Sequence, residues 1–217
     1  MTRPTNARIA GLTFLLYIAV AFPSMVLFGR ATRGEGIAAR LAGLARHAAD
    51  VHLAVVLSLA GCFAALVLAV TLHALTRDED PDLAMLGLTC RVAEGIAGAV
   101  SIAGTLGLLW LATATGPDAP DPVAAQTLGA FILKDTPLVS ATFFAVGSTL
   151  FSWLLLRGRM IPVALAWLGV VASILLVVGL PLQLAGVLRG PVSQLMWLPM
   201  AAFEIPLGAW LLIKGVR

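Results

Sequence analysis

Long apolar runs, separated by short polar segments, follow one another along the whole chain. Six runs hold enough apolar residues to cross about 30 Å of hydrocarbon, which takes about 20 residues of helix. They are 9–29, 51–75, 83–115, 121–156, 160–188 and 194–213. None alternates apolar and polar residues as the strands of a membrane β-barrel do. The pattern predicts an all-α fold, a polytopic transmembrane helical bundle with six spans and a single domain over residues 1–217.

Two of the runs are longer than a bilayer requires. Runs 83–115 and 121–156 each exceed 30 residues, which corresponds to some 50 Å of helix. The second begins at Asp121 and Pro122, a capping residue followed by a proline in the first turn. We expect these two runs to form a hairpin that is strongly tilted, kinked near Pro137, or projecting beyond the bilayer.

Composition supports a membrane protein. Hydrophobic residues make up 60% of the chain and charged residues 12%, against roughly 45–50% and about 25% in soluble domains. The net charge of +3 comes from scattered arginines, so we expect the lipid bilayer and not nucleic acid as a partner. Seven Lys and Arg residues lie in the predicted loops and ends on the side of the membrane that holds both termini, and five lie in those on the opposite side. This bias favours insertion in the cell membrane with both termini cytoplasmic.

The longest loop, residues 30–50, carries its own helical pattern. Ile37, Leu41 and Leu44 recur at helical spacing, with Arg40 and Arg46 among them. We expect a short amphipathic helix, lying either on the membrane surface or in solvent.

Four ionisable residues fall inside the apolar runs: Arg91, Glu94, Asp135 and Glu204. At mid-membrane each costs about 2.5–3.5 kcal/mol to insert, so each requires a partner or a function. Arg91 and Glu94 are three residues apart, which puts them on one helix face. Small or polar residues continue this face at spacings of three and four, as expected of a face that meets other helices; they are Gly87, Gly98, Ser101 and Thr105.

Glu204 is the expected partner of this pair. It lies about 16 Å into the last run, and Glu94 is about as deep in its own, so antiparallel packing brings them to a common level. One arginine between two carboxylates leaves a surplus negative charge, which predicts a bound proton, a cation, a proton path or a donor-rich ligand. Two interpretations stay open, a ligand site or an internal network that fixes helix packing. Asp135, adjacent to Lys134, is a fourth candidate.

Metal and cofactor sites are not predicted. The spacing of His47, Asp50 and His52 matches no zinc pattern. His52 and His73 lie about 30 Å apart along one helix, and a transmembrane haem needs ligands at one depth. No phosphate-binding loop or nucleophile motif occurs in the sequence.

Several segments carry a resemblance to a family. They include Ala7 to Leu12, Arg91 to Glu94, the Ile161-Pro162 pair and above all the ending, Phe203-Glu204 followed by Leu207 to Val216. Together with Asp135 they make the chain similar, over nearly its whole length, to the DUF4386 family of bacterial membrane proteins of unknown function. The resemblance implies a six-span inner-membrane protein in which the Arg91, Glu94 and Glu204 positions belong to the family's pattern. It implies no activity.

Three functional hypotheses follow. The first is a bundle whose polar cluster binds a small molecule, lipid or proton in a sensory or transport role. The second is an accessory or scaffold protein whose buried charges are structural. The third is an intramembrane enzyme acting on lipids, with a carboxylate as general acid or base.

Overall fold

The structure, a computed structural model, describes residues 1–117, 119–134 and 138–216. Within these ranges the chain forms helices and no strands, which confirms the all-α prediction. The helices are α1 (Arg3–Ala31), α2 (Gly36–Arg46), α3 (Ala48–Thr76), α4 (Pro81–Thr113), α5 (Pro122–Lys134), α6 (Leu138–Arg157), α7 (Val163–Leu184), α8 (Val192–Leu195) and α9 (Leu198–Ile213).

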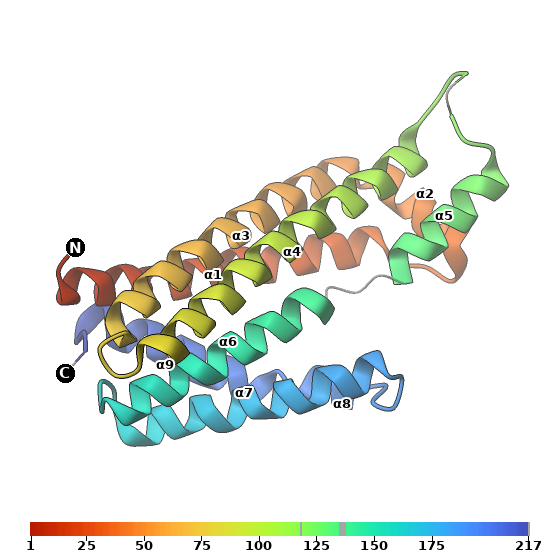
Figure 1. The fold of residues 1–217 in the computed structure, drawn as a ribbon. Coiled ribbons are helices and arrows are strands. Elements are labelled where there is room, and N and C mark those ends of the chain that lie inside the picture. The colour runs from red at the N-terminus through yellow and green to blue at the C-terminus, as the bar shows by residue number, and fades with distance from the viewer. Residues whose placement is uncertain (118, 135–137, 217) are drawn as a thin grey trace.

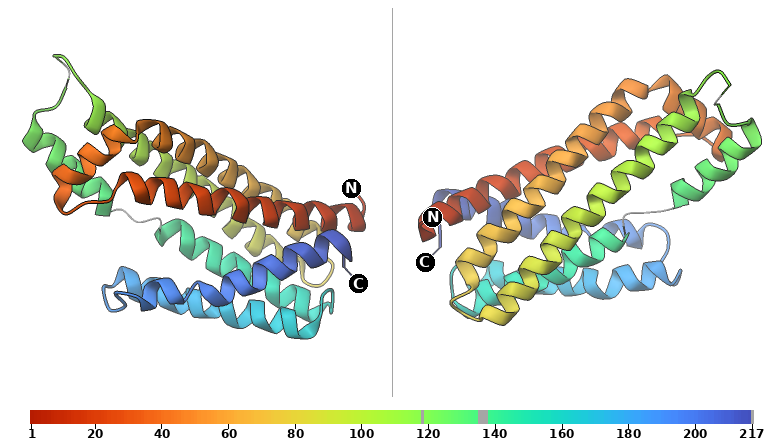
Figure 2. Two further views of the ribbon diagram at one scale, coloured as in Figure 1. Left: turned by 180° about the vertical axis from the view of Figure 1, so that it is seen from behind. Right: turned by 45° about the horizontal axis from the view of Figure 1, so that its top comes forward.

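The long helices form a closed ring. Going along the chain, α1 packs on α3, α3 on α4, α4 on α6, α6 on α7 and α7 on α9, and α9 returns to pack against α1. The helices run roughly along one common direction, and the N- and C-termini lie at the same end (Figures 1 and 2). This arrangement gives the bundle an interior lined by all six elements, in which a side chain is shielded from lipid.

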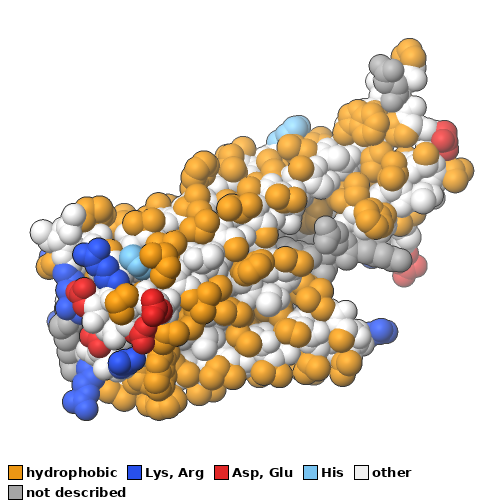
Figure 3. Space-filling model, in the orientation of Figure 1, with side chains coloured by type: hydrophobic (Ala, Val, Ile, Leu, Met, Phe, Trp, Pro, Cys, Tyr) orange, Lys and Arg blue, Asp and Glu red, His pale blue; other side chains and the backbone are white. Residues whose placement is uncertain are grey.

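In the part of the chain that the structure describes, six helical segments are long and apolar enough to cross a membrane, as the sequence predicted. Apolar side chains cover the length of the visible face, and charged side chains gather mainly at the end that holds the termini (Figure 3). Length, composition and this distribution make the protein a multi-pass membrane protein. Its membrane of residence and the side on which the termini lie stay predictions.

Within the described residues, run 121–156 contains the helices α5 and α6. The predicted cap is present, because Oδ1 of Asp121 accepts hydrogen bonds from the backbone N–H groups of Val123 and Ala124, at 2.9 and 3.0 Å. Pro137, the predicted kink, lies outside the described residues. The last run is divided, since α8 ends at Leu195 and α9 begins at Leu198, next to Pro199. Pro199 stands in the first turn of α9, where its missing backbone N–H is tolerated.

The predicted amphipathic helix in the 30–50 loop is α2, at the end of the bundle opposite the termini (Figure 1). Its apolar face does not lie free. Leu41 and Leu44 are buried in a cluster with Leu108 of α4 and Ala125 of α5. Gly129 of α5 lies directly against Leu41, where an added Cβ would come within 3.3 Å of its side chain. α2 and α5 therefore pack together over the end of the α1, α3 and α4 group.

Candidate functional site

Arg91 and Glu94 of α4 lie at the centre of the ring. Nη1 of Arg91 is 2.9 Å from Oε2 of Glu94, and the two side chains are only 1% and 5% exposed. The i, i+3 spacing therefore produces the ion pair that the sequence indicated. Oε1 of the same carboxylate accepts a 2.9 Å hydrogen bond from the Tyr17 hydroxyl of α1. Glu94 thus links α4 to the first span as well as to Arg91.

The guanidinium of Arg91 is held by charge and by aromatic rings. Although Nη1 and Oε2 are close, their geometry is not that of a hydrogen bond, and within the described chain Nε, Nη1 and Nη2 have no hydrogen-bond acceptor. Cζ lies 5.7 Å from the ring centre of Tyr17 and 5.0 Å from that of Phe144 on α6. Both distances fit cation–π contacts, which gain strength when water is excluded.

Glu204 of α9 is the second carboxylate near Arg91. A small cavity of about 10 Å³ is lined by both Arg91 and Glu204, together with Ser152, Phe151 and Phe203. This volume is close to the minimum, about 10–15 Å³, that can hold one water molecule. The structure therefore brings Arg91, Glu94 and Glu204 together near one level, as the depth argument predicted. Asp135, the fourth candidate, lies outside the described residues.

A much larger cavity begins on the opposite side of Glu94. It has a volume of about 800 Å³ and lies between α1, α3 and α4, with α5 and the start of α6 completing its wall. Small-molecule sites have volumes of about 300–1,000 Å³. Tyr17 and Glu94 line its inner end. Its rim includes Met25, Val100 and Phe131, which are 65%, 69% and 75% exposed, so the cavity is open where the bundle meets lipid.

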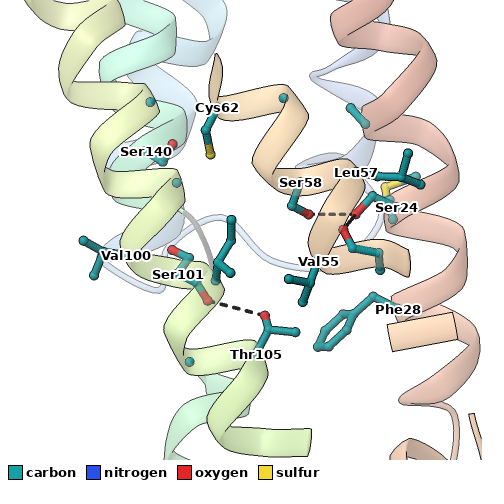
Figure 4. A pocket seen from close by; sticks show the side chains of 18 of the residues that line it. Ser24, Phe28, Val55, Leu57, Ser58, Cys62, Val100, Ser101, Thr105 and Ser140 are labelled. Atoms are coloured by element: carbon teal, nitrogen blue, oxygen red, sulfur yellow. Dashed lines mark hydrogen bonds between the residues drawn. The ribbon is translucent and has the colours of Figure 1, made fainter. Parts of the chain in front are cut away.

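The small and polar stripe of α4 forms one wall of this large cavity. Glu94, Gly98, Ser101 and Thr105 all line it. Gly98 lies close to α3, because an added Cβ would come within 3.1 Å of Cys62 Sγ. Facing this wall are Ser24 of α1 and Ser58 of α3, whose hydroxyl groups point toward each other (Figure 4). The stripe thus serves a cavity and not only helix contacts.

Sequence reasoning did not single out Tyr17, Ser24, Ser58 or Ser140. Each has apolar residues on both sides in the sequence, and no pattern within its own helix separates it from ordinary packing. Their common position around one cavity becomes evident only once the ring is assembled. No group of three or more His, Cys, Asp or Glu side chains within the described ranges is placed to hold a metal ion.

Fold and site together define a class: a multi-pass helical membrane protein with a buried ion pair and a membrane-facing cavity. The sequence model of one family, described as "Domain of unknown function (DUF4386)", matches residues 9–215. The chain belongs to the DUF4386 family. No curated protein and no solved structure matches it.

Proposed function

We propose that this protein binds a small membrane-dissolved molecule in the cavity between α1, α3 and α4, in a sensory or transport role. The observation that carries the proposal is the contact between a cavity of about 800 Å³ and the buried carboxylate of Glu94. The residues at the rim are exposed, so a ligand can enter the cavity directly from lipid. The apolar walls suit the hydrocarbon part of such a ligand. Glu94 and the hydroxyl groups offer a polar group a fixed position inside.

A scaffold role is the second candidate. The observation that favours it is the near-complete burial of Arg91, which sits between two aromatic rings and a carboxylate. Buried ion pairs of this kind can specify helix packing without any ligand. In that case the cavity is filled by ordinary lipid chains and has no preferred occupant.

Mass spectrometry of the protein purified in a mild detergent separates the two. We expect a molecule retained in fixed ratio to the protein and lost in Gly98→Leu, whose side chain begins between Cys62 and Ser140 inside the cavity. Gly107→Leu is the matched control, because Gly107 lies on the same helix but does not line the cavity. A protein that is stable and empty, or a ligand retained equally by both variants, contradicts the proposal.

A further inference from the structure

The polar groups of the large cavity differ in what they offer a ligand. A hydroxyl group has one hydrogen to donate and two lone pairs that accept. Ser24 of α1 donates its hydrogen to the backbone oxygen of Ala54, at 2.9 Å. Its oxygen is also 2.8 Å from that of Ser58. Since Ser24 has already used its hydrogen, Ser58 is the donor of this second bond.

The hydroxyl groups on the opposite wall have also used their hydrogens. Ser101 donates to the backbone oxygen of Ala97 at 3.2 Å, and Thr105 donates to that of Ser101 at 3.4 Å. Ser140 of α6 donates to the backbone oxygen of Glu94 at 3.0 Å. All three bonds run to helix carbonyls, so they form without any ligand. Each hydroxyl oxygen still has lone pairs that can accept.

The inner end of the cavity has the same character. Tyr17 gives its hydrogen to Oε1 of Glu94, so the phenol oxygen is left as an acceptor. Oε2 of Glu94 has almost no exposed surface and lies beside the Arg91 guanidinium, so it balances that charge. The thiol of Cys62 is a weak donor. From Glu94 to Thr105, the oxygens that line the cavity therefore accept hydrogen bonds and have none to give.

We infer that the occupant of this cavity has an apolar body and a head group that donates hydrogen bonds, a primary amine or a hydroxyl. The inference rests on the proposed function and names the ligand's chemistry. An acceptor-only head, such as an ether or ester oxygen, would face lone pairs on every side. A carboxylate head would in addition face Glu94. Arg91 with Glu94 and Glu204 forms a cluster with one positive and two negative groups, which favours the amine among the donors.

A competition series on the wild-type protein in lipid nanodiscs tests this chemistry without any variant. The probe is a long-chain primary alkylamine that carries a photoreactive diazirine in its chain. Competitors of equal chain length are the amine, the alcohol, the methyl ether and the carboxylate. Peptide mass spectrometry locates the cross-link, which we expect on the α3 and α4 segments that line the cavity, 54–65 and 94–108.

We expect the amine or the alcohol to displace the probe at least about tenfold better than the ether. The ether has no hydrogen to donate, so it loses a hydrogen bond to the charged Glu94. The carboxylate should not displace it. Displacement by the amine alone assigns an ammonium ligand, and equal displacement by the alcohol assigns a hydroxyl ligand. If the ether competes as well as the amine, the donor inference is wrong while the binding function stands. Cross-links spread over the outer surface, with none in the cavity segments, contradict both.

Discussion

The Tyr17 hydroxyl of α1 donates a 2.9 Å hydrogen bond to Oε1 of Glu94 on α4, so one carboxylate joins the large cavity to the buried arginine. Its other oxygen lies 2.9 Å from Nη1 of Arg91. Anything that binds to Glu94 from the cavity side therefore acts on the carboxylate that also neutralises Arg91. Glu94 therefore belongs both to the cavity wall and to the central ion pair.

Tyr17→Phe should lower stability without destroying the fold. The ring remains to contact Arg91, but Oε1 of Glu94 loses its donor. A buried acceptor left without a partner costs about 1–3 kcal/mol. Thermal unfolding in detergent, followed by circular dichroism, measures the loss. An unchanged melting temperature would show that the Tyr17 to Glu94 bond contributes little.

Tyr17 also provides a spectroscopic report on the cavity, because it is the only tyrosine in the chain. Protein labelled with 3-fluorotyrosine should give one ¹⁹F resonance, and addition of a long-chain alkylamine should shift it. The Gly98→Leu variant should keep the resonance and lose the shift, whereas Gly107→Leu should keep both. A shift of equal size in Gly98→Leu would place the amine elsewhere.

Arg91→Met should be the most damaging single change at the centre. Removing one partner of a buried ion pair leaves an uncompensated charge and costs about 3–5 kcal/mol. Adding Glu94→Gln removes the nearer of the two carboxylates that face Arg91, and the amide oxygen can still accept from Tyr17. The double variant should therefore melt well above Arg91→Met alone. Equal melting temperatures for the single and double variants would mean that the charge of Glu94 is not what destabilises Arg91→Met.

Asp80 begins α4 and is expected to act mainly as a helix cap. Its Oδ1 accepts from the backbone N–H of Leu83 at 3.1 Å, and its Oδ2 accepts from Arg157 at 3.2 Å. Loss of a cap costs about 0.5–2 kcal/mol, whereas a half-exposed ion pair is worth at most about 1 kcal/mol. Asp80→Asn keeps a capping oxygen and should stay near wild type, and Asp80→Ala should melt lower. If Asp80→Asn melts as far below wild type as Asp80→Ala does, the pair with Arg157 matters more than the cap.

The six spans and the Arg91 to Glu94 pair were predictable because both depend on order along one helix. Apolar length sets the spans, and a spacing of three sets the pair. The depth of Glu204 was also predictable, since rise per residue is fixed. By contrast, the contact of Phe144 with Arg91 depends on how α6 packs against α4. The large cavity has the same origin, because helices that diverge leave space that no single helix pattern encodes.

The α2 helix likewise has a part that the sequence predicts and a part that only the structure shows. Its amphipathic face was evident from Ile37, Leu41 and Leu44, but the sequence left open what covers that face. The structure places Leu41 and Leu44 against α4 and α5. A pattern of apolar residues thus predicts that a face is covered, and only the assembled bundle shows by which elements.

Gly11 closes the ring where α1 meets α9, and Gly11→Ala should weaken that closure. An added Cβ would lie 2.6 Å from the backbone oxygen of Gly208 and would also collide with the backbone N of Leu212. Since backbone atoms cannot swing aside, α1 and α9 would have to move apart, at a cost of about 1–3 kcal/mol. Alanine favours helix over glycine by about 1 kcal/mol, so a measured loss reflects the contact.

Gly29→Ala is the matched control on the same helix, because within the described chain an added Cβ there meets no atom within 4 Å. It should leave the melting temperature unchanged or raise it slightly. We expect Gly11→Ala to melt several degrees lower than Gly29→Ala in the same detergent. If the two variants have the same melting temperature, α1 and α9 do not pack closely at Gly11. The bundle in detergent would then not be the closed ring that encloses Arg91 and Glu204.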